Sequence, residues 1–344
     1  MKLIRSFGFA IAATLLIWGG IFWWGGWGAL FTVIVLTALE TTFSADNAVI
    51  NSKVLMTMSH FWRILFLTVG IFIAVFVVRF ILPILIVMLT AHLGFNEVLQ
   101  LALNDSQTYA HYLETAEPSI SAFGGAFLLL IALSYFIDYQ KKTHWFDWLE
   151  SHLGQLGRYD NVTTFIMLLG SLLLYFTVSP HDQHAVLLAS SCAITLHIAL
   201  DLMDAVFEKH YSPTSGRALK TGLAGFTAFA YLEVLDASFS LDGVIGAFAL
   251  TGDVILIMAG LGAGAVWVRS LTVYLVKEKT LSKYIYLEHG AHWAIAFLGT
   301  IMWLKLYDVH PPEFLVGIGG LVVITLALIA SRRPRAMKVQ KQLD

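Results

Sequence analysis

Ten long apolar segments divide this chain of 344 residues, and they constrain its fold more than any other feature. An α-helix needs about 20 predominantly apolar residues to cross the hydrocarbon layer of a bilayer, and most of the segments reach that length. Hydrophobic residues make up 58% of the chain and charged residues only 13%, about half the share typical of a soluble domain. The sequence therefore predicts an all-α polytopic membrane protein in a lipid bilayer. The predicted spans cover residues 7–24, 28–51, 63–90, 119–137, 162–179, 184–207, 221–249, 252–276, 287–306 and 314–331.

Lysine and arginine residues outside the spans predict the orientation of the chain. They occur at the N-terminus, in every second connection and in the C-terminal tail, whereas the intervening connections contain none. By the positive-inside rule, this alternation places both termini in the cytoplasm. The acidic connection over residues 91–118 is then expected to face outward as a loop.

Two polar motifs inside apolar spans share one pattern. Residues 40–50 read ETTFSADNAVI and residues 236–246 read DASFSLDGVIG, so an acidic residue, a Phe-Ser pair and an aspartate recur at the same spacing. The span after each motif carries an arginine, Arg79 or Arg269. Five spans separate the two motifs, so the second copy is expected to be inverted in the membrane, as in many secondary transporters. The prediction is one membrane domain over 1–344, with repeat copies at about 28–138 and 221–308 and additional spans at 7–24, 162–207 and 314–331.

Carboxylates inside the repeated spans are the strongest functional signal. An ionised carboxylate at membrane depth is costly and usually faces a cavity, a partner charge or an ion. Five carboxylates accompany two arginines, so a divalent cation would offset most of the surplus negative charge. Oxygen ligands favour hard cations such as Mg²⁺, Ca²⁺ or Mn²⁺. The candidate ligands and supporting groups are Glu40, Ser44, Asp46, Asn47, Glu233, Asp236, Ser240 and Asp242, with Arg79 and Arg269 as charge partners.

The spacing within each motif raises a question about helix geometry. Asp46 lies six residues after Glu40, about 120° away around an ideal helix. Either the second aspartate faces a different neighbour, or the helix unwinds between serine and aspartate. Gly243 and Gly246 would permit unwinding in the second copy. The polar groups could also serve only to hold helices together through hydrogen bonds and internal salt bridges.

Two further polar groups lie near predicted cytoplasmic span ends. His197, Asp201 and Asp204 are spaced to share one helix face, where they could line a vestibule, relay protons or reach toward the headgroups. His289 and His292 are spaced three residues apart at the start of a span. They are candidates for a gate or an accessory metal site, or are histidines of the membrane interface.

The motifs LETTFSADNAV at residues 39–49 and EVLDASFSLDGVIGAF at residues 233–248, each followed by a span with an arginine, resemble the TerC-like integral membrane family. That family is named for tellurium resistance and is related to the LysE-type exporters. The resemblance covers roughly residues 28–310. It implies export of a divalent metal, chiefly Mn²⁺, across the bacterial inner membrane, with Glu40, Asp46, Asn47, Asp236 and Asp242 as ligands. Gly243 departs from the pattern, because the first motif has Asn47 at that position.

The sequence thus predicts a secondary active exporter that works by alternating access, with protons as a candidate counter-ion and no resident cofactor. No Walker motif or catalytic nucleophile–base pair was found, so we expect neither ATP-driven transport nor an enzyme, and nothing suggests a nucleic-acid partner. Two alternatives remain open. One is an exporter of a small organic solute, and the other is a non-transporting scaffold in a metal or tellurite stress complex.

Overall fold

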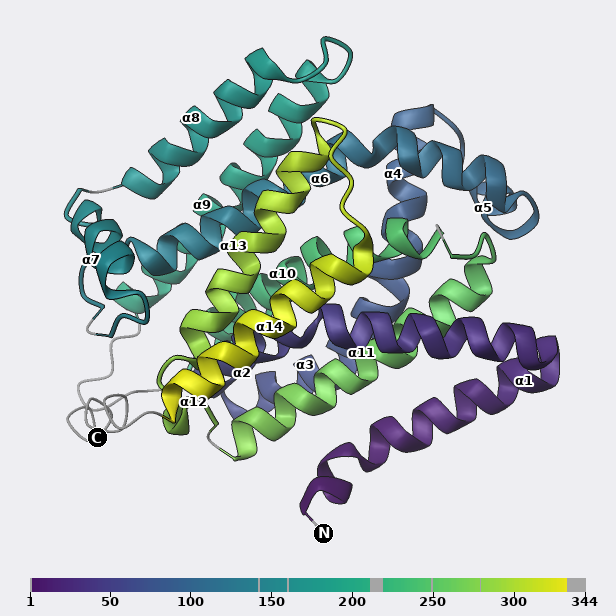
Figure 1. Ribbon diagram of the computed structural model, residues 1–344, viewed down its shortest axis with the longest axis horizontal. Helices are drawn as coiled ribbons and strands as arrows, with labels where there is room; N and C mark the ends of the chain where they lie inside the picture. Colours follow the sequence, from purple (N-terminus) through teal and green to yellow (C-terminus); the bar gives the residue numbers. More distant parts are fainter. Residues whose placement is uncertain are drawn as a thin grey trace.

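Helices form nearly all regular structure in the described part of the chain (Figure 1). The computed structural model describes residues 2–141, 143–159, 161–210, 219–248, 250–278 and 280–332, without the side chains of residues 2–6, 43, 204–210, 241–242, 281–282 and 313–314. The elements are α1 (Lys2–Phe43), α2 (Ala45–Thr57), α3 (His60–Phe72), the π-helix η1 (Ile73–Ile81), α4 (Leu82–Ala91), α5 (Phe95–Asn104), α6 (Ser106–Phe136), α7 (Asp147–Leu156), α8 (Val162–Thr177), α9 (Gln183–His210), α10 (Gly222–Phe248), α11 (Val254–Lys277), α12 (Thr280–Lys283), α13 (Leu287–Lys305) and α14 (Glu313–Ser331).

Long apolar helices confirm the predicted membrane-protein class. Five helical stretches within the described residues are long and apolar enough to cross a bilayer, and two shorter apolar helices accompany them. Large apolar side chains such as Leu16, Phe31 and Leu89 are exposed on the outside of the bundle. Such a surface suits lipid rather than water. The five stretches are Phe7–Thr42, His60–Ala91, Ser106–Phe136, Gln183–Met203 and Val254–Lys277; the shorter helices are Val162–Thr177 and Leu315–Ser331.

The N-terminal hairpin corresponds to the first two predicted spans. α1 changes direction at Gly26, whose φ of 69° and ψ of −160° belong to a region that other residues rarely adopt. The two arms of α1 consequently form the V at the lower right of Figure 1. The second arm leads to the first polar motif.

The connection over residues 91–118 is not the loop that its acidic composition suggested. α5 and the first turns of α6 occupy most of it. Val98, Ala102, Tyr109 and Leu113 are buried and pack in an apolar cluster with α4. The loop prediction was wrong because apolar residues at helical spacing outweigh the exposed acids between them.

Glycines allow the helices that carry the carboxylates to approach their neighbours closely. A Cβ atom on Gly264 of α11 would lie 2.5 Å from the Cβ and Cγ atoms of Glu40, and one on Gly70 of α3 would lie 2.5 Å from Oε1 of Glu233. Small residues at such contacts are typical of helix packing inside membranes. Glycines therefore let α1, which carries Glu40, pack closely on α11, and let α10, which carries Glu233, pack closely on α3.

Connections rich in lysine and arginine meet at one end of the bundle, which we call the lysine-rich end. Met58, after α2, forms an isolated parallel β-bridge with Lys220, before α10. The hydroxyl of Tyr135, in the last turn of α6, lies 3.0 Å from Nδ1 of His289 in the first turn of α13. The segments that the charge pattern assigned to one side of the membrane are thus neighbours in space.

Candidate functional site

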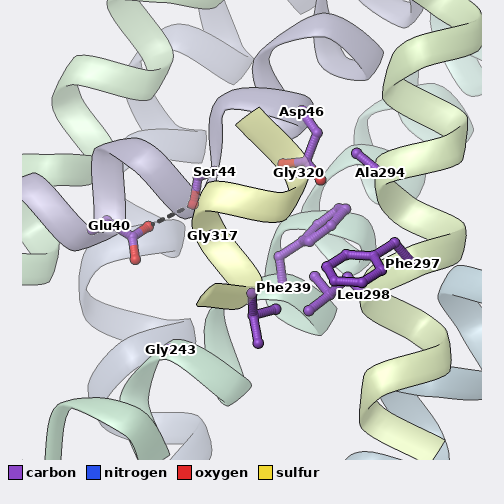
Figure 2. A pocket seen from close by; sticks show the side chains of 11 residues that line it. Glu40, Ser44, Asp46, Phe239, Gly243, Ala294, Phe297, Leu298, Gly317 and Gly320 are labelled. Atoms are coloured by element: carbon purple, nitrogen blue, oxygen red, sulfur yellow. Dashed lines mark hydrogen bonds between the residues drawn. The ribbon is translucent and has the colours of Figure 1, made fainter. Parts of the chain in front are cut away.

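The first polar motif lies where α1 ends and α2 begins. Ser44 has a φ of −96° and a ψ of 17°, outside the helical region. The backbone N–H of Ser44 still donates to the carbonyl of Glu40 (3.0 Å), and that of Ala48 donates to the carbonyl of Ser44 (3.3 Å). The chain therefore changes direction between Glu40 and Asp46 (Figure 2). It keeps these backbone hydrogen bonds across the bend.

The second motif lies in an uninterrupted helix. α10 continues through Asp236 and Gly243 to Phe248, so Gly243 and Gly246 do not unwind it. Of the two alternatives that the spacing left open, unwinding does not occur in α10, because glycine only permits a break, and an apolar setting strongly favours intact backbone hydrogen bonds. The side chain of Asp242 lies outside the described residues.

A small cavity opens beside the interruption at Ser44 (Figure 2). The centre of a water-sized occupant can move within about 30 Å³, which is enough space for a water molecule or a small ion. Glu40, Ser44 and Asp46 supply the polar wall. The remaining wall comes from α10, α13 and α14 through Phe239, Gly243, Ala294, Phe297, Leu298, Val316, Gly317 and Gly320.

The two carboxylates of the cavity differ in their partners. Oε1 of Glu40 accepts a hydrogen bond from Ser44 Oγ (3.0 Å) and forms a buried ion pair with Arg79 of η1. Asp46 is 4% exposed and accepts the backbone N–H of Asn47 (3.0 Å). No arginine, lysine or histidine in the described part of the chain forms an ion pair with Asp46. The cavity therefore combines a neutralised carboxylate with a buried carboxylate that lacks a counter-charge.

The second motif forms an ion pair at the equivalent position. Nη2 of Arg269 lies 3.3 Å from Oδ2 of Asp236 and 3.6 Å from Oε1 of Glu233. The same guanidinium donates to the carbonyls of Phe66 (3.2 Å) and Gly70 (3.3 Å). In the alignment of the two motifs, this pair corresponds to Arg79 and Glu40. Asp236 and Glu233 do not line the cavity.

Several buried polar atoms on α2 and α10 have no hydrogen-bond partner among the described residues. They are Oδ1 of Asn47, both amide atoms of Asn51, both carboxylate oxygens of Glu233 and Oγ of Ser240. Leaving a buried polar group unsatisfied costs about 1–3 kcal/mol, so such groups usually contact water or an ion. The sequence interpretation missed Asn51, although its position four residues after Asn47 places both on one helix face.

The histidine candidates lie apart from the cavity. Nδ1 of His197 is 3.1 Å from Oδ2 of Asp201, whose side chain is largely exposed. The ring of His292 stacks on Tyr135 at a centroid distance of 3.7 Å. The side chain of Asp204 falls outside the described residues, as does that of Asp242. Within the described side chains, no three His, Cys, Asp or Glu residues form a group that could hold a metal ion.

The last predicted span also belongs to the site, which the sequence did not indicate. Val316, Gly317 and Gly320 of α14 line the cavity, although α14 lies outside both predicted repeat copies. The two glycines add no side chain to this wall, which leaves room for the cavity beside Val316. A local excess of glycine in an apolar span was the available signal.

Comparison with known proteins gives a family without an assigned activity. Residues 45–337 match a family model described as "Protein of unknown function (DUF475)". No curated protein and no solved structure matches the chain. The matched region includes Asp46, both arginines and the second motif, whereas Glu40 precedes it. This match does not carry the TerC name, and the resemblance of the motifs to the TerC-like family stays a prediction.

Proposed function

The chain belongs to the DUF475 family, whose function is unknown, and we propose that it is a secondary active exporter of a divalent cation, with Mn²⁺ as the first candidate. The observation that carries this proposal is Asp46. It is a buried carboxylate without a counter-charge among the described residues, and it borders a cavity of ionic size at a bend of the helix.

The chemistry of the polar wall favours a hard cation. Glu40, Ser44 and Asp46 present carboxylate and hydroxyl oxygens, the donors that Mg²⁺, Ca²⁺ and Mn²⁺ prefer. Arg79 already offsets the charge of Glu40, which leaves Asp46 for the ion. Asp242, six residues after Asp236 as Asp46 is after Glu40, would add a second negative charge and balance a divalent ion.

Equivalent contacts between the motifs support an inverted repeat within a ten-span bundle. Thr37, three residues before Glu40, donates to the carbonyl of Gly260 (3.2 Å). Glu233, three residues before Asp236, lies against Gly70. The motif helix of each copy thus contacts a glycine of the other copy, and that glycine lies nine residues before the arginine of its own copy. Such reciprocal contacts are expected when two related halves pack around a pseudo-two-fold axis, the arrangement that supports alternating access.

The charge distribution supports a cytoplasmic location for the lysine-rich end, in the bacterial inner membrane. Lys53, Lys141 and Lys220 lie there, and positively charged connections remain in the cytoplasm. Export then moves the cation from this end to the opposite one. When the ion leaves, Asp46 would again be a buried charge without a partner, so uptake of a proton would neutralise it and couple export to proton entry.

Transport into proteoliposomes tests the proposal. Purified protein reconstituted in one orientation is expected to carry Mn²⁺, and Asp46→Asn is expected to lower the flux at least about tenfold, as for the loss of about 1.4 kcal/mol of binding free energy. Asp253→Asn makes the same chemical change at the cap of α11, away from the cavity, and is expected to transport normally. Normal flux in Asp46→Asn would refute the site.

The same assay separates the two alternatives. A cavity of about 30 Å³ favours an ion over an organic solute, so amino acids are not expected to compete with Mn²⁺. A non-transporting scaffold would carry no ion, and its role in a stress complex would survive Asp46→Asn.

A further inference from the structure

α2 and α13 pack antiparallel between the cavity and the lysine-rich end. Asp46 of α2 and Ala294 of α13 both line the cavity. Seven residues after Asp46, Lys53 forms an ion pair with Glu288, which lies six residues before Ala294. The two helices therefore run side by side from the cavity to this ion pair.

An apolar layer fills the space between the cavity and the ion pair. Val49 and Ile50 of α2 and Ala291 of α13 lie along the helices between these two points, and they are all buried and belong to one apolar cluster. A hydrated cation cannot pass such a layer while the helices remain in contact, because it would lose its water without gaining oxygen ligands. This end of the path is closed in the structure.

The ion pair is the polar end of this closure. Nζ of Lys53 lies 5.4 Å from the centroid of the Tyr135 ring, on which His292 stacks. The side chains of Lys53 and Glu288 are 48% and 24% exposed. An ion pair with this exposure is weak and is screened by salt, so it can open and close readily.

The start of α13 is held more firmly than its contact with α2. Glu150 of α7 is fully buried and accepts hydrogen bonds from the Trp293 indole (3.1 Å) and the backbone N–H of Trp145 (3.2 Å). The same carboxylate lies 3.3 Å from Nε2 of His289 and 3.0 Å from Nζ of Lys141. The start of α13 is thus fixed to α7, and separation at the ion pair is the less costly movement.

We propose that the cation enters the cavity from the lysine-rich end between α2 and α13, and that the Lys53–Glu288 ion pair closes this route. The identity of the passing ion rests on the proposed function, whereas the closure rests on the contacts between the two helices. Lys53 and Glu288 are gate residues and do not bind the ion in the cavity.

Thiol labelling at Ala294 tests the route without measuring transport. Cys192→Ser removes the native cysteine, and Ala294→Cys places a reporter in the cavity wall. A membrane-impermeant maleimide applied from the lysine-rich side is expected to react slowly. Glu288→Lys sets like charges opposite each other and is expected to raise the rate at least about fivefold, the shift expected when a half-exposed ion pair is lost. The exchanged pair Lys53→Glu/Glu288→Lys is expected to restore slow labelling.

Glu278→Lys is the matched control. Glu278 and Lys283 form an ion pair of similar exposure (3.8 Å) that does not join α2 to α13. Reversing the charge at position 278 is expected to leave the labelling rate of the thiol at position 294 unchanged. Equal rates in the parent and Glu288→Lys, or failure of the exchanged pair to restore slow labelling, would overturn the proposal.

A second variant covers the case in which Ala294→Cys does not fold. Lys53→Cys/Glu288→Cys joins the two helices when oxidised, and Mn²⁺ flux is expected to stop and to return with reductant. Persistent flux in the oxidised protein overturns the route. If labelling depends on the ion pair but the wild-type protein carries neither Mn²⁺, Mg²⁺ nor Ca²⁺, the proposed function fails, whereas the closure of the cavity by the Lys53–Glu288 ion pair stands.

Discussion

The two polar motifs make the same ion pair in different helical settings. In the first motif the chain bends at Ser44, and Glu40 faces both Arg79 and the cavity. In the second, α10 is continuous, and Asp236 faces Arg269 away from the cavity. The comparison separates two roles that the sequence pattern merged. The arginine–acid pair is common to both copies and stabilises them, whereas the cavity arises only where the helix bends.

A second difference lies beside each pair. The position three residues before the paired acid is Thr37 in the first copy, where its hydroxyl is satisfied by backbone carbonyls. In the second copy it is Glu233, whose carboxylate oxygens accept no hydrogen bond from a described residue. At this position the copy without a bend thus has two unsatisfied carboxylate oxygens where the other copy has a satisfied hydroxyl, so water or a second ion would be drawn to Glu233.

Replacing either arginine is the strongest test of whether the arginine–acid ion pair stabilises both copies. Arg79→Met and Arg269→Met each leave a buried carboxylate without its partner, so the free energy of unfolding is expected to fall by about 3–5 kcal/mol. Thermal unfolding in detergent micelles measures this loss. Removing the acid as well, in Arg79→Met/Glu40→Gln, is expected to recover most of it. A large loss for one arginine and none for the other would break the equivalence of the two copies.

Asp46→Asn and Asp236→Asn are expected to act in opposite directions. Removing the unpaired charge of Asp46 should raise the free energy of unfolding in metal-free buffer by about 1–3 kcal/mol while it abolishes Mn²⁺ flux. Asp236→Asn leaves Arg269 with Glu233 at 3.6 Å and should lower stability. Paired thermal unfolding and flux assays check both effects. Greater stability in Asp236→Asn than in Asp46→Asn would contradict the division of roles.

Glycine substitutions sharpen the comparison at the helix contacts. Gly264→Ala would press on the Cβ and Cγ atoms of Glu40, near the helix backbone, whereas Gly70→Ala meets the flexible end of Glu233. Overpacking is expected to cost about 1–3 kcal/mol at Gly264 and less at Gly70. Gly20→Ala is the control, because no atom lies within 4 Å of its added Cβ. The unfolding midpoint should be highest for Gly20→Ala, lower for Gly70→Ala and lowest for Gly264→Ala. A reversed order would argue against close packing at Glu40.

The smallest expected effect concerns α7, whose Glu150 holds the start of α13 in the second copy. Burial opposes ionisation of Glu150, but His289 and Lys141 together with the Trp293 hydrogen bond hold the pKa of this carboxyl below its ordinary value. Because the folded-state pKa is lowered, its contribution is complete above pH 4.5 and is lost only as the pH falls through the lowered pKa. Protease sensitivity of the connection around α7 should therefore stay constant from pH 7 to about pH 5 and rise in stronger acid.

Glu150→Gln provides the check on this prediction. The substitution removes the charge but keeps a side chain of similar size, so it is expected to expose the connection around α7 at neutral pH and to destabilise the protein by about 1–2 kcal/mol. Asp105→Asn changes an exposed helix cap at the other end of the bundle and should leave the connection protected. Protection of α7 in Glu150→Gln would show that the ion pairs do not hold it.

The sequence by itself determined the helices, the bilayer environment and the positions of the buried acids. Apolar length and the cost of an isolated charge in lipid are local properties, and they also indicated Arg79 and Arg269 as charge partners. The tertiary structure alone decided that the chain bends at Ser44 rather than at Gly243, that residues 91–118 are helical, and that α14 lines the cavity. These features depend on contacts between residues far apart in the chain, and packing against neighbours overrides local preference wherever the local signal is weak.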